Sequence, residues 1–293
     1  MRLLALALLP CLTSGLVLPS AAARVPARCA APTLLFSKAV QVVPDDAEEG
    51  SFGKALRRVQ GSPTRAAMAL TYAAALYYVG SGTAPGGSPE DTIRIVTECL
   101  DTAAPPTLFF CVFNALGVVP ALYAAILLPG AREKNNGPVP AATIATSFFA
   151  GFGGLAPYLI TRRPRTEPVS RSDLGFVCRT VTESRAFGAA MLLASAALAS
   201  RLFAIDDLPA ALATYRELFD AYGIVNVSSF DLLVLSAFFF EPAREDMQRR
   251  GWWAAKGEQP SAAQVARLAA FCAVPVLGPA AYVAVRPALP EDL

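Results

Sequence analysis

One stretch, residues 223–253, limits most strongly what this chain can fold into, because it joins an apolar run of membrane length to a charged and aromatic end. Its apolar core runs from Leu232 to Phe240, and a helix over the whole stretch as far as Ala243 is just long enough to cross a bilayer. Trp252 and Trp253 follow the charges, at a position typical of the aromatic belt at a membrane surface. We therefore interpret the other long apolar runs as helices packed around this segment.

The charged end of this stretch carries both signs at helical spacings, in Glu241, Arg244, Glu245, Asp246, Arg249 and Arg250. Such spacing is typical of a solvated helix end with weak ion pairs. The three carboxylates also stand on adjacent turns of one helix, from which they could hold a divalent cation. The interleaved arginines favour ion pairing over a metal site.

Asp231 allows two interpretations. In the first it belongs to a capping box, with Ser228 as the N-cap and Val227 packing on Leu232 as a hydrophobic staple. In the second it is an ionisable residue at membrane depth and hence a proton or cation site, because a buried carboxylate there is costly. The preference for acids in the first helical turn favours the cap, and both interpretations stay open.

Four further apolar runs are long enough to cross a membrane: residues 107–128, 139–161, 186–205 and 266–285. With the central run they predict an all-α, polytopic membrane protein of about five transmembrane helices. A shorter alanine-rich segment, residues 66–80, is either a sixth span or a helix lying at the membrane surface. The composition agrees, since 54% of residues are apolar and 16% charged, against roughly 25% charged in soluble chains.

The basic residues predict an orientation. Six arginines lie between residues 162 and 185, and the segment 244–256 adds four more basic side chains. By the positive-inside rule these loops face the cytosol-equivalent side, which in a plastid is the stroma. A span at 66–80 would move the basic N-terminal tail to the opposite side, so the rule favours a surface helix there.

Residues 1–44 contain no Asp or Glu. Met1–Gly15 has the leucine-rich core of a signal peptide, and the basic, Ala-, Ser- and Pro-rich segment after it has the composition of a transit peptide. Together they resemble the bipartite leader of plastid proteins in algae with secondary plastids; the alternative is an ordinary secreted or endomembrane protein. We expect a removable leader at 1–44, an N-terminal tail with interfacial or amphipathic helices at 45–105, a transmembrane domain at 106–287 and a short tail at 288–293.

Glycine and proline recur inside three of the apolar runs, at Gly117–Pro120, Gly154–Pro157 and Pro275–Pro279. In a bilayer such residues kink helices and let backbones approach closely. The aromatic and glycine-rich patch at 148–154 is the expected place for another helix or a flat ligand to pack. Kinked packing without a ligand is the simpler interpretation.

The absence of histidine excludes several kinds of chemistry, among them Ser-His-Asp catalysis, H-E-x-x-H zinc sites and haem or chlorophyll held by imidazole. The chain also has no P-loop, no dinucleotide fingerprint and no C-x-x-C pair. Its net charge of +2, without basic residues interleaved with aromatics, gives no nucleic-acid surface. We therefore expect no enzyme activity, no metal site and no nucleic-acid partner.

Several short motifs carry a resemblance: Phe113–Pro120, Gly154–Tyr158 before an Arg-rich loop, Tyr215–Phe219, Ser228–Asp231, Glu245–Met247 and Gly278–Ala280. Through them the region from about Phe109 to Pro287 resembles a family of uncharacterised multi-span proteins of cyanobacteria and plastids. The resemblance implies a membrane architecture and a compartment, and no established activity.

Two functions follow as hypotheses. The first is a non-catalytic protein of the thylakoid membrane, or of the inner envelope, acting as an accessory or assembly subunit of a photosynthetic complex among membrane lipids and other subunits. It would bind chlorophyll, carotenoid or lipid, with Asn114, Glu241 and Gln264 as candidate chlorophyll ligands. The alternative is a small solute carrier or proton-coupled transporter, with Asp231, Asn114 and Arg201 along the pathway.

Overall fold

The computed structural model describes residues 59, 61–101, 107–131, 140–162, 165, 169–255 and 257–291. The described residues all belong to one compact unit, Glu49–Leu293. Over the described residues 77% of positions are helical and none forms a strand, which confirms the predicted all-α class. The leader predicted at 1–44 lies outside the described residues.

The helices are α3 (Pro63–Gly80), α4 (Pro89–Leu100), α5 (Leu108–Leu127), α6 (Pro140–Thr161), α7 (Arg185–Phe203), α8 (Leu208–Ala221), α9 (Gly223–Phe238), α10 (Phe240–Arg249), α11 (Ala262–Ala273) and α12 (Leu277–Val285), with a 3₁₀ turn η1 (Leu128–Gly130) and a π-helical turn η2 (Cys178–Thr182). Four described segments are long and apolar enough to cross a membrane: Leu108–Gly130, Pro140–Thr161, Arg185–Phe203 and Gly223–Arg249. They coincide with four of the five predicted runs.

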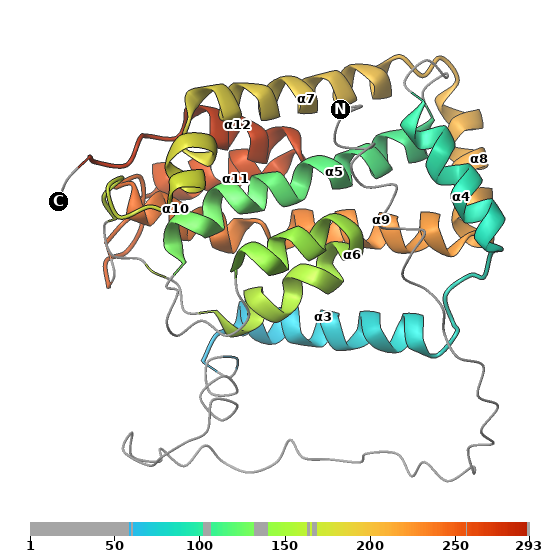
Figure 1. Ribbon diagram of the computed structural model, residues 1–293, viewed down its shortest axis with the longest axis horizontal. Helices are drawn as coiled ribbons and strands as arrows, with labels where there is room; N and C mark the ends of the chain where they lie inside the picture. Colours follow the sequence, from blue (N-terminus) through green and yellow to red (C-terminus); the bar gives the residue numbers. More distant parts are fainter. Residues whose placement is uncertain are drawn as a thin grey trace, which may run out of the picture. The chain divides into compact units, whose positions relative to one another are not determined.

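α5 is the central helix of the unit, because it contacts α4, α6, α7, α8, α9, α10 and α12. In Figure 1 the helices α3, α5, α7 and α9 extend across the view between two ends. At one end α4 and α8 meet in a small apolar cluster built on Ile95, Cys99, Phe109 and Val225. The other end holds α10, α11 and α12 together with η2, and we call it the ionic end for reasons given below.

α6 is broken at its middle. Gly151 has φ 50° and ψ −130°, so the helix stops there and starts again at the next residue. The two halves fold against each other, since a Cβ on Gly154 would lie 2.8 Å from the backbone carbon of Thr146, eight positions earlier in the chain. Figure 1 shows both halves side by side next to α3. The run predicted as one span at 139–161 is therefore a hairpin of two short helices.

The last apolar run, predicted as one span at 266–285, is also broken. Val276, at φ 64°, separates α11 from α12. The rings of Phe271 and Tyr282 pack with their centroids 5.4 Å apart, a distance that eleven residues of continuous helix, about 16 Å long, do not allow. A Cβ on Gly278 would meet the carbonyl oxygen of Phe271 at 2.4 Å, so this turn also requires glycine.

The capping box predicted at Ser228 and Asp231 is wrong. α9 begins at Gly223, after Tyr222 in extended conformation, and both predicted cap residues lie inside the helix. The start is fixed by tertiary contact, because the Gly223 amide donates to the Gly86 carbonyl at 3.0 Å and a Cβ on Gly223 would meet Pro85 oxygen at 2.6 Å. Asp231 is therefore a carboxylate in the middle of an apolar helix.

Candidate functional site

Asp231 lies at the break in α6. Its Oδ1 accepts a hydrogen bond from the Phe152 amide at 3.3 Å, which is the first amide after the break. A Cβ on Gly151 would come within 2.0 Å of Asp231 Oδ2, so the carboxylate occupies the space that a side chain at 151 would need. Asp231 thus acts as an N-cap for the second half of α6, supplied by a different helix.

The surroundings of this carboxylate are aromatic and uncharged. Phe152 stacks on Phe238 with centroids 5.8 Å apart, and Tyr72 of α3 meets Phe152 edge-on at 6.3 Å. None of the described arginines or lysines forms an ion pair with Asp231. Its charge is therefore held by one backbone amide and by the positive end of the second half-helix.

α3 is tied to the α9–α10 segment on either side of Asp231. Toward the α4–α8 end, Tyr78 donates a hydrogen bond to Asn226 Oδ1 at 3.0 Å. Toward the ionic end, Arg65 Nε pairs with Glu241 Oε1 at 3.5 Å. The folded tip of α6 contacts both α3 and α9, so the break lies between two helices that these polar contacts hold together.

The ionic end contains a buried charge network around Asp246, which is fully buried. Its carboxylate accepts hydrogen bonds from Arg249 at 3.1 Å, Arg250 at 2.8 Å, Arg286 at 3.1 Å and the Tyr282 hydroxyl at 2.8 Å. Glu183 completes it by pairing with Arg250 and Arg286 at 2.7 and 2.9 Å. We call these six residues the Asp246 network. Its members come from α10, α12, the residue that follows each of these helices, and the loop before α7.

A second set of buried charges adjoins the Asp246 network through α10. Arg162 pairs with Glu245, and Arg65 donates to the Arg162 carbonyl at 2.7 Å in addition to its pair with Glu241. Burial disfavours the charged form of Arg162, but Glu245 outweighs it and raises the pKa of the guanidinium. For Arg250 burial is likewise outweighed, by Asp246 and Glu183, and its pKa is raised. Both arginines are therefore permanent cations.

The solvated helix end predicted for α10 is wrong. Glu241, Glu245, Asp246, Arg249 and Arg250 are all buried. Many of their partners come from segments far away in the sequence, which local spacing does not reveal. The structure also gives no support to a cation site here, because no group of three or more metal-ligating side chains occurs among the described residues.

The candidate pigment ligands lie apart from one another. The Asn114 amide donates to the Cys99 and Phe110 carbonyls at 3.0 and 2.9 Å, which joins α5 to α4. Glu241 lies at the ionic end, where its Oε2 is buried without a partner among the described residues. Gln264 forms a capping box with Ser261 at the start of α11.

The candidate transport residues are also only partly together. The Arg201 guanidinium lies over the Phe110 ring at 5.4 Å, so Arg201 and Asn114 share the α4–α8 end of α5. Asp231 lies instead between α9 and α6. Sequence reasoning named this carboxylate and the patch at 148–154, in which Gly151 lies, but it did not predict that the helix breaks at Gly151. The glycines of the patch indicate where a helix can bend, and they do not indicate how it bends.

Comparisons of the chain with family models, with curated proteins and with solved structures returned no match. Function must therefore be inferred from the chemistry of the chain's own residues. Two carboxylates of the α9–α10 segment have contrasting surroundings: Asp231 accepts from one backbone amide, whereas Asp246 accepts from three arginines and a tyrosine.

Proposed function

We propose that this chain is a membrane-embedded carrier for protons or a small cation, with Asp231 as the group that takes up and releases the positive charge. The observation that carries the proposal is the placement of Asp231 at the break of α6, where its carboxylate accepts one hydrogen bond, from a backbone amide, within the described part of the chain. Ionisable residues inside apolar helices are costly and commonly mark proton or ion pathways. Interrupted helices near the middle of the membrane are a recurring way of building such sites.

The proposal includes a topology in which α3, α5, α7 and the α9–α10 segment cross the membrane, while α6 and the α11–α12 pair enter and return at the ionic end. Because α6 is then not a span, the start of α3, with Arg65, lies on the same side as Arg162 and Glu241, and the positive-inside rule no longer opposes a spanning α3. Each arm of α6 has about ten residues, or about 15 Å, which is half the hydrocarbon thickness. In support, the residue after α6, Arg162, and the residue after α12, Arg286, both bond to carboxylates of α10. Segments that enter and return are tolerated when protein surrounds them.

A charge change at Asp231 would act on the α6 hairpin. The ionised carboxylate accepts from the Phe152 amide and interacts with the half-helix dipole. Protonation or cation binding removes that negative charge and weakens its hold on the hairpin tip. The tip of α6 is therefore the element that we expect to move during transport.

The test is ion flux through the full chain reconstituted in liposomes. A potassium diffusion potential set with valinomycin drives protons inward, and an entrapped pH dye reports them; sodium and potassium are tested with the matching ion dyes. We expect flux in the wild type and its loss in Asp231→Asn, with Asp220→Asn, an exposed carboxylate of α8, as the matched control. No flux in any condition, or equal flux in Asp231→Asn, would contradict the proposal.

A second candidate function is that of a subunit in a photosynthetic membrane complex. The observation in its favour is α7, an apolar helix whose membrane-length window is only 11% buried, and which therefore faces either lipid or another protein. The plastid location and pigment binding through Asn114, Glu241 or Gln264 belong to this proposal. Native fractionation of solubilised plastid membranes tests it, because a subunit migrates with a pigmented band at constant stoichiometry, whereas a carrier migrates apart from it.

A further inference from the structure

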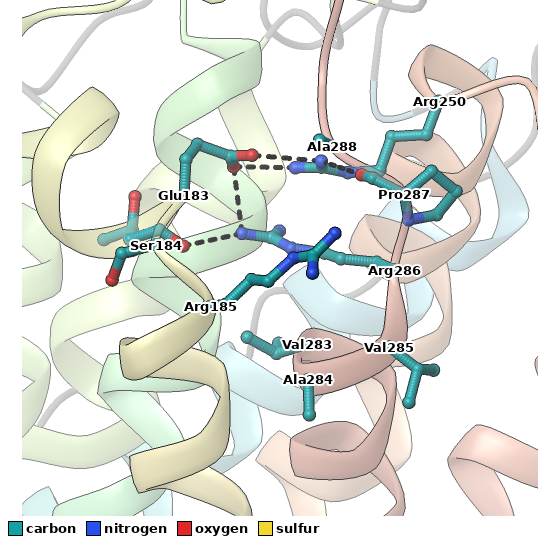
Figure 2. A pocket seen from close by; sticks show the side chains of 11 residues that line it. Glu183, Ser184, Arg185, Arg250, Val283, Ala284, Val285, Arg286, Pro287 and Ala288 are labelled. Carbon is teal, nitrogen blue, oxygen red and sulfur yellow. Dashed lines mark hydrogen bonds and ion pairs between the residues drawn. The ribbon is translucent and has the colours of Figure 1, made fainter.

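A polar cavity of ≈ 350 Å³ opens beside the Asp246 network (Figure 2). One wall comes from the start of α7 and the residues before it, including Glu183, Ser184 and Arg185. The opposite wall comes from the end of α12 and the residues after it, together with Arg250. The cavity therefore lies at the ionic end of the unit, between the N-terminus of α7 and the C-terminus of α12.

The charge around the cavity is positive. The Asp246 network as a whole has three arginines, Arg249, Arg250 and Arg286, and two carboxylates, which leaves one uncompensated positive charge. Of these arginines, Arg250 and Arg286 line the cavity. Glu183, the carboxylate in the cavity wall, has both oxygens bonded to Arg250 and one also to Arg286. Its negative charge is thus neutralised, and it presents little repulsion to an anion.

Arg185 adds a second positive charge and free donors. It is exposed, lines the cavity, and forms no ion pair with any other described residue. It is also the first residue of α7, where Ser184 caps the helix by accepting from the Phe187 amide at 3.1 Å. The remaining first-turn amides have no partner within the helix, and the positive end of its dipole favours an anion there.

An apolar surface continues from the cavity along the two helices. Val283, Ala284 and Val285 of α12 form part of its wall. α7 and α12 pack so closely that a Cβ on Gly188 would lie 2.9 Å from the Ala284 Cα. Beyond this contact α7 also has exposed apolar side chains, among them Leu193, Leu202 and Phe203. A ligand with a charged head and apolar chains would therefore find a complementary surface for both parts.

We propose that this cavity binds a phosphate oxyanion, with Arg185 and the first-turn amides of α7 as donors and the Asp246 network as the positive floor. The oxyanion can be the phosphodiester of an anionic lipid headgroup or free inorganic phosphate. Guanidinium groups match such oxygens in geometry and charge. The site is separate from Asp231 and does not depend on ion transport.

The experiment compares the two sources of phosphate on the full chain, purified in a detergent with an uncharged headgroup. Native mass spectrometry measures binding of phosphatidylglycerol and of phosphatidylcholine with the same acyl chains. A parallel thermal melt compares inorganic phosphate with chloride at equal ionic strength. We expect Arg185→Gln to weaken anion binding about tenfold, as loss of one charge-assisted contact predicts.

Arg179→Gln is the matched control, because Arg179 is an exposed arginine in the same loop region that does not line the cavity. The lipid source is supported if the wild type binds phosphatidylglycerol in preference to phosphatidylcholine, and if this preference falls in Arg185→Gln and persists in Arg179→Gln. The free anion is supported if inorganic phosphate raises the melting temperature without any lipid preference, and if this effect falls in Arg185→Gln and persists in Arg179→Gln. Absence of both effects, or an equal loss in the two variants, would overturn the proposal, and size-exclusion profiles confirm that each variant is folded.

Discussion

Asp231 and Asp246 stand on the same apolar segment, Gly223–Arg249, and are held in opposite ways. Asp246 accepts from three arginines and one tyrosine. Asp231 accepts one backbone hydrogen bond, at 3.3 Å. A carboxylate with several fixed cations cannot change its charge without disrupting them, whereas one with a single amide partner can. The comparison favours a structural role for Asp246, and it supports the proposal that Asp231 changes its charge or binds a cation.

The largest expected effect tests the structural half of this comparison. Asp246→Asn leaves Arg249, Arg250 and Arg286 buried with Glu183 as the remaining carboxylate of the network, and breaking a buried ion network in this way costs about 3–5 kcal/mol. The free energy of unfolding in detergent, measured by chemical denaturation, should fall by that amount. Asp220→Asn, at an exposed position, should leave it unchanged. A small loss in Asp246→Asn would show that Asp246 is no more structural than Asp231.

The break in α6 gives the next largest effect. Gly151→Ala forces a residue with a Cβ into positive φ and against the Asp231 carboxylate, which should cost about 2–3 kcal/mol. Gly153→Ala lies in the same helix with no atom within 4 Å of the added carbon, so it should be neutral or stabilise by about 0.5–1 kcal/mol. Unfolding midpoints that shift in opposite directions would confirm the break, and equal shifts would contradict it.

The sequence predicted the helices well and their interruptions poorly. The runs at 107–128, 139–161 and 186–205 match α5, α6 and α7 within a few residues, because apolar runs of membrane length favour helix wherever they occur. A glycine such as Gly151 allows a helix either to bend or to fold back on itself. The group that occupies the space beside Gly151 is the Asp231 carboxylate, which lies eighty positions later in the chain. That information is tertiary and has no local signal.

The charged end shows the same limit. Glu241, Glu245 and Asp246 stand at spacings that fit a solvated helix end, yet α10 is buried. The three carboxylates pair with Arg65, Arg162 and Arg286, which come from three distant segments. The helical spacing of charges is the same whether their partners are water or other helices, so only the structure distinguishes the two.

A smaller effect should come from the one uncharged partner of Asp246. Tyr282→Phe removes the hydroxyl that donates to Asp246 Oδ2 at 2.8 Å but leaves all three arginines in place. A hydrogen bond to a charged group contributes about 1.5–3 kcal/mol, and we expect the lower value because Asp246 keeps its other donors. Tyr77→Phe, at a side chain 74% exposed, is the control in the same denaturation experiment. A loss in Tyr282→Phe as large as that in Asp246→Asn would mean that the hydroxyl, and not the charge, holds the network.

The smallest expected effect tests the other half of the comparison. Asp231→Asn keeps an oxygen that accepts from the Phe152 amide and removes a charge whose burial is unfavourable. Its free energy of unfolding should therefore stay within about 0.5 kcal/mol of the wild type, although we expect its ion flux to be lost. Asp231→Ala removes the acceptor as well and should cost about 1 kcal/mol, the usual value of an N-cap. If Asp231→Asn destabilised the protein as much as Asp246→Asn, both carboxylates would be structural, and the reason for assigning transport to Asp231 would disappear.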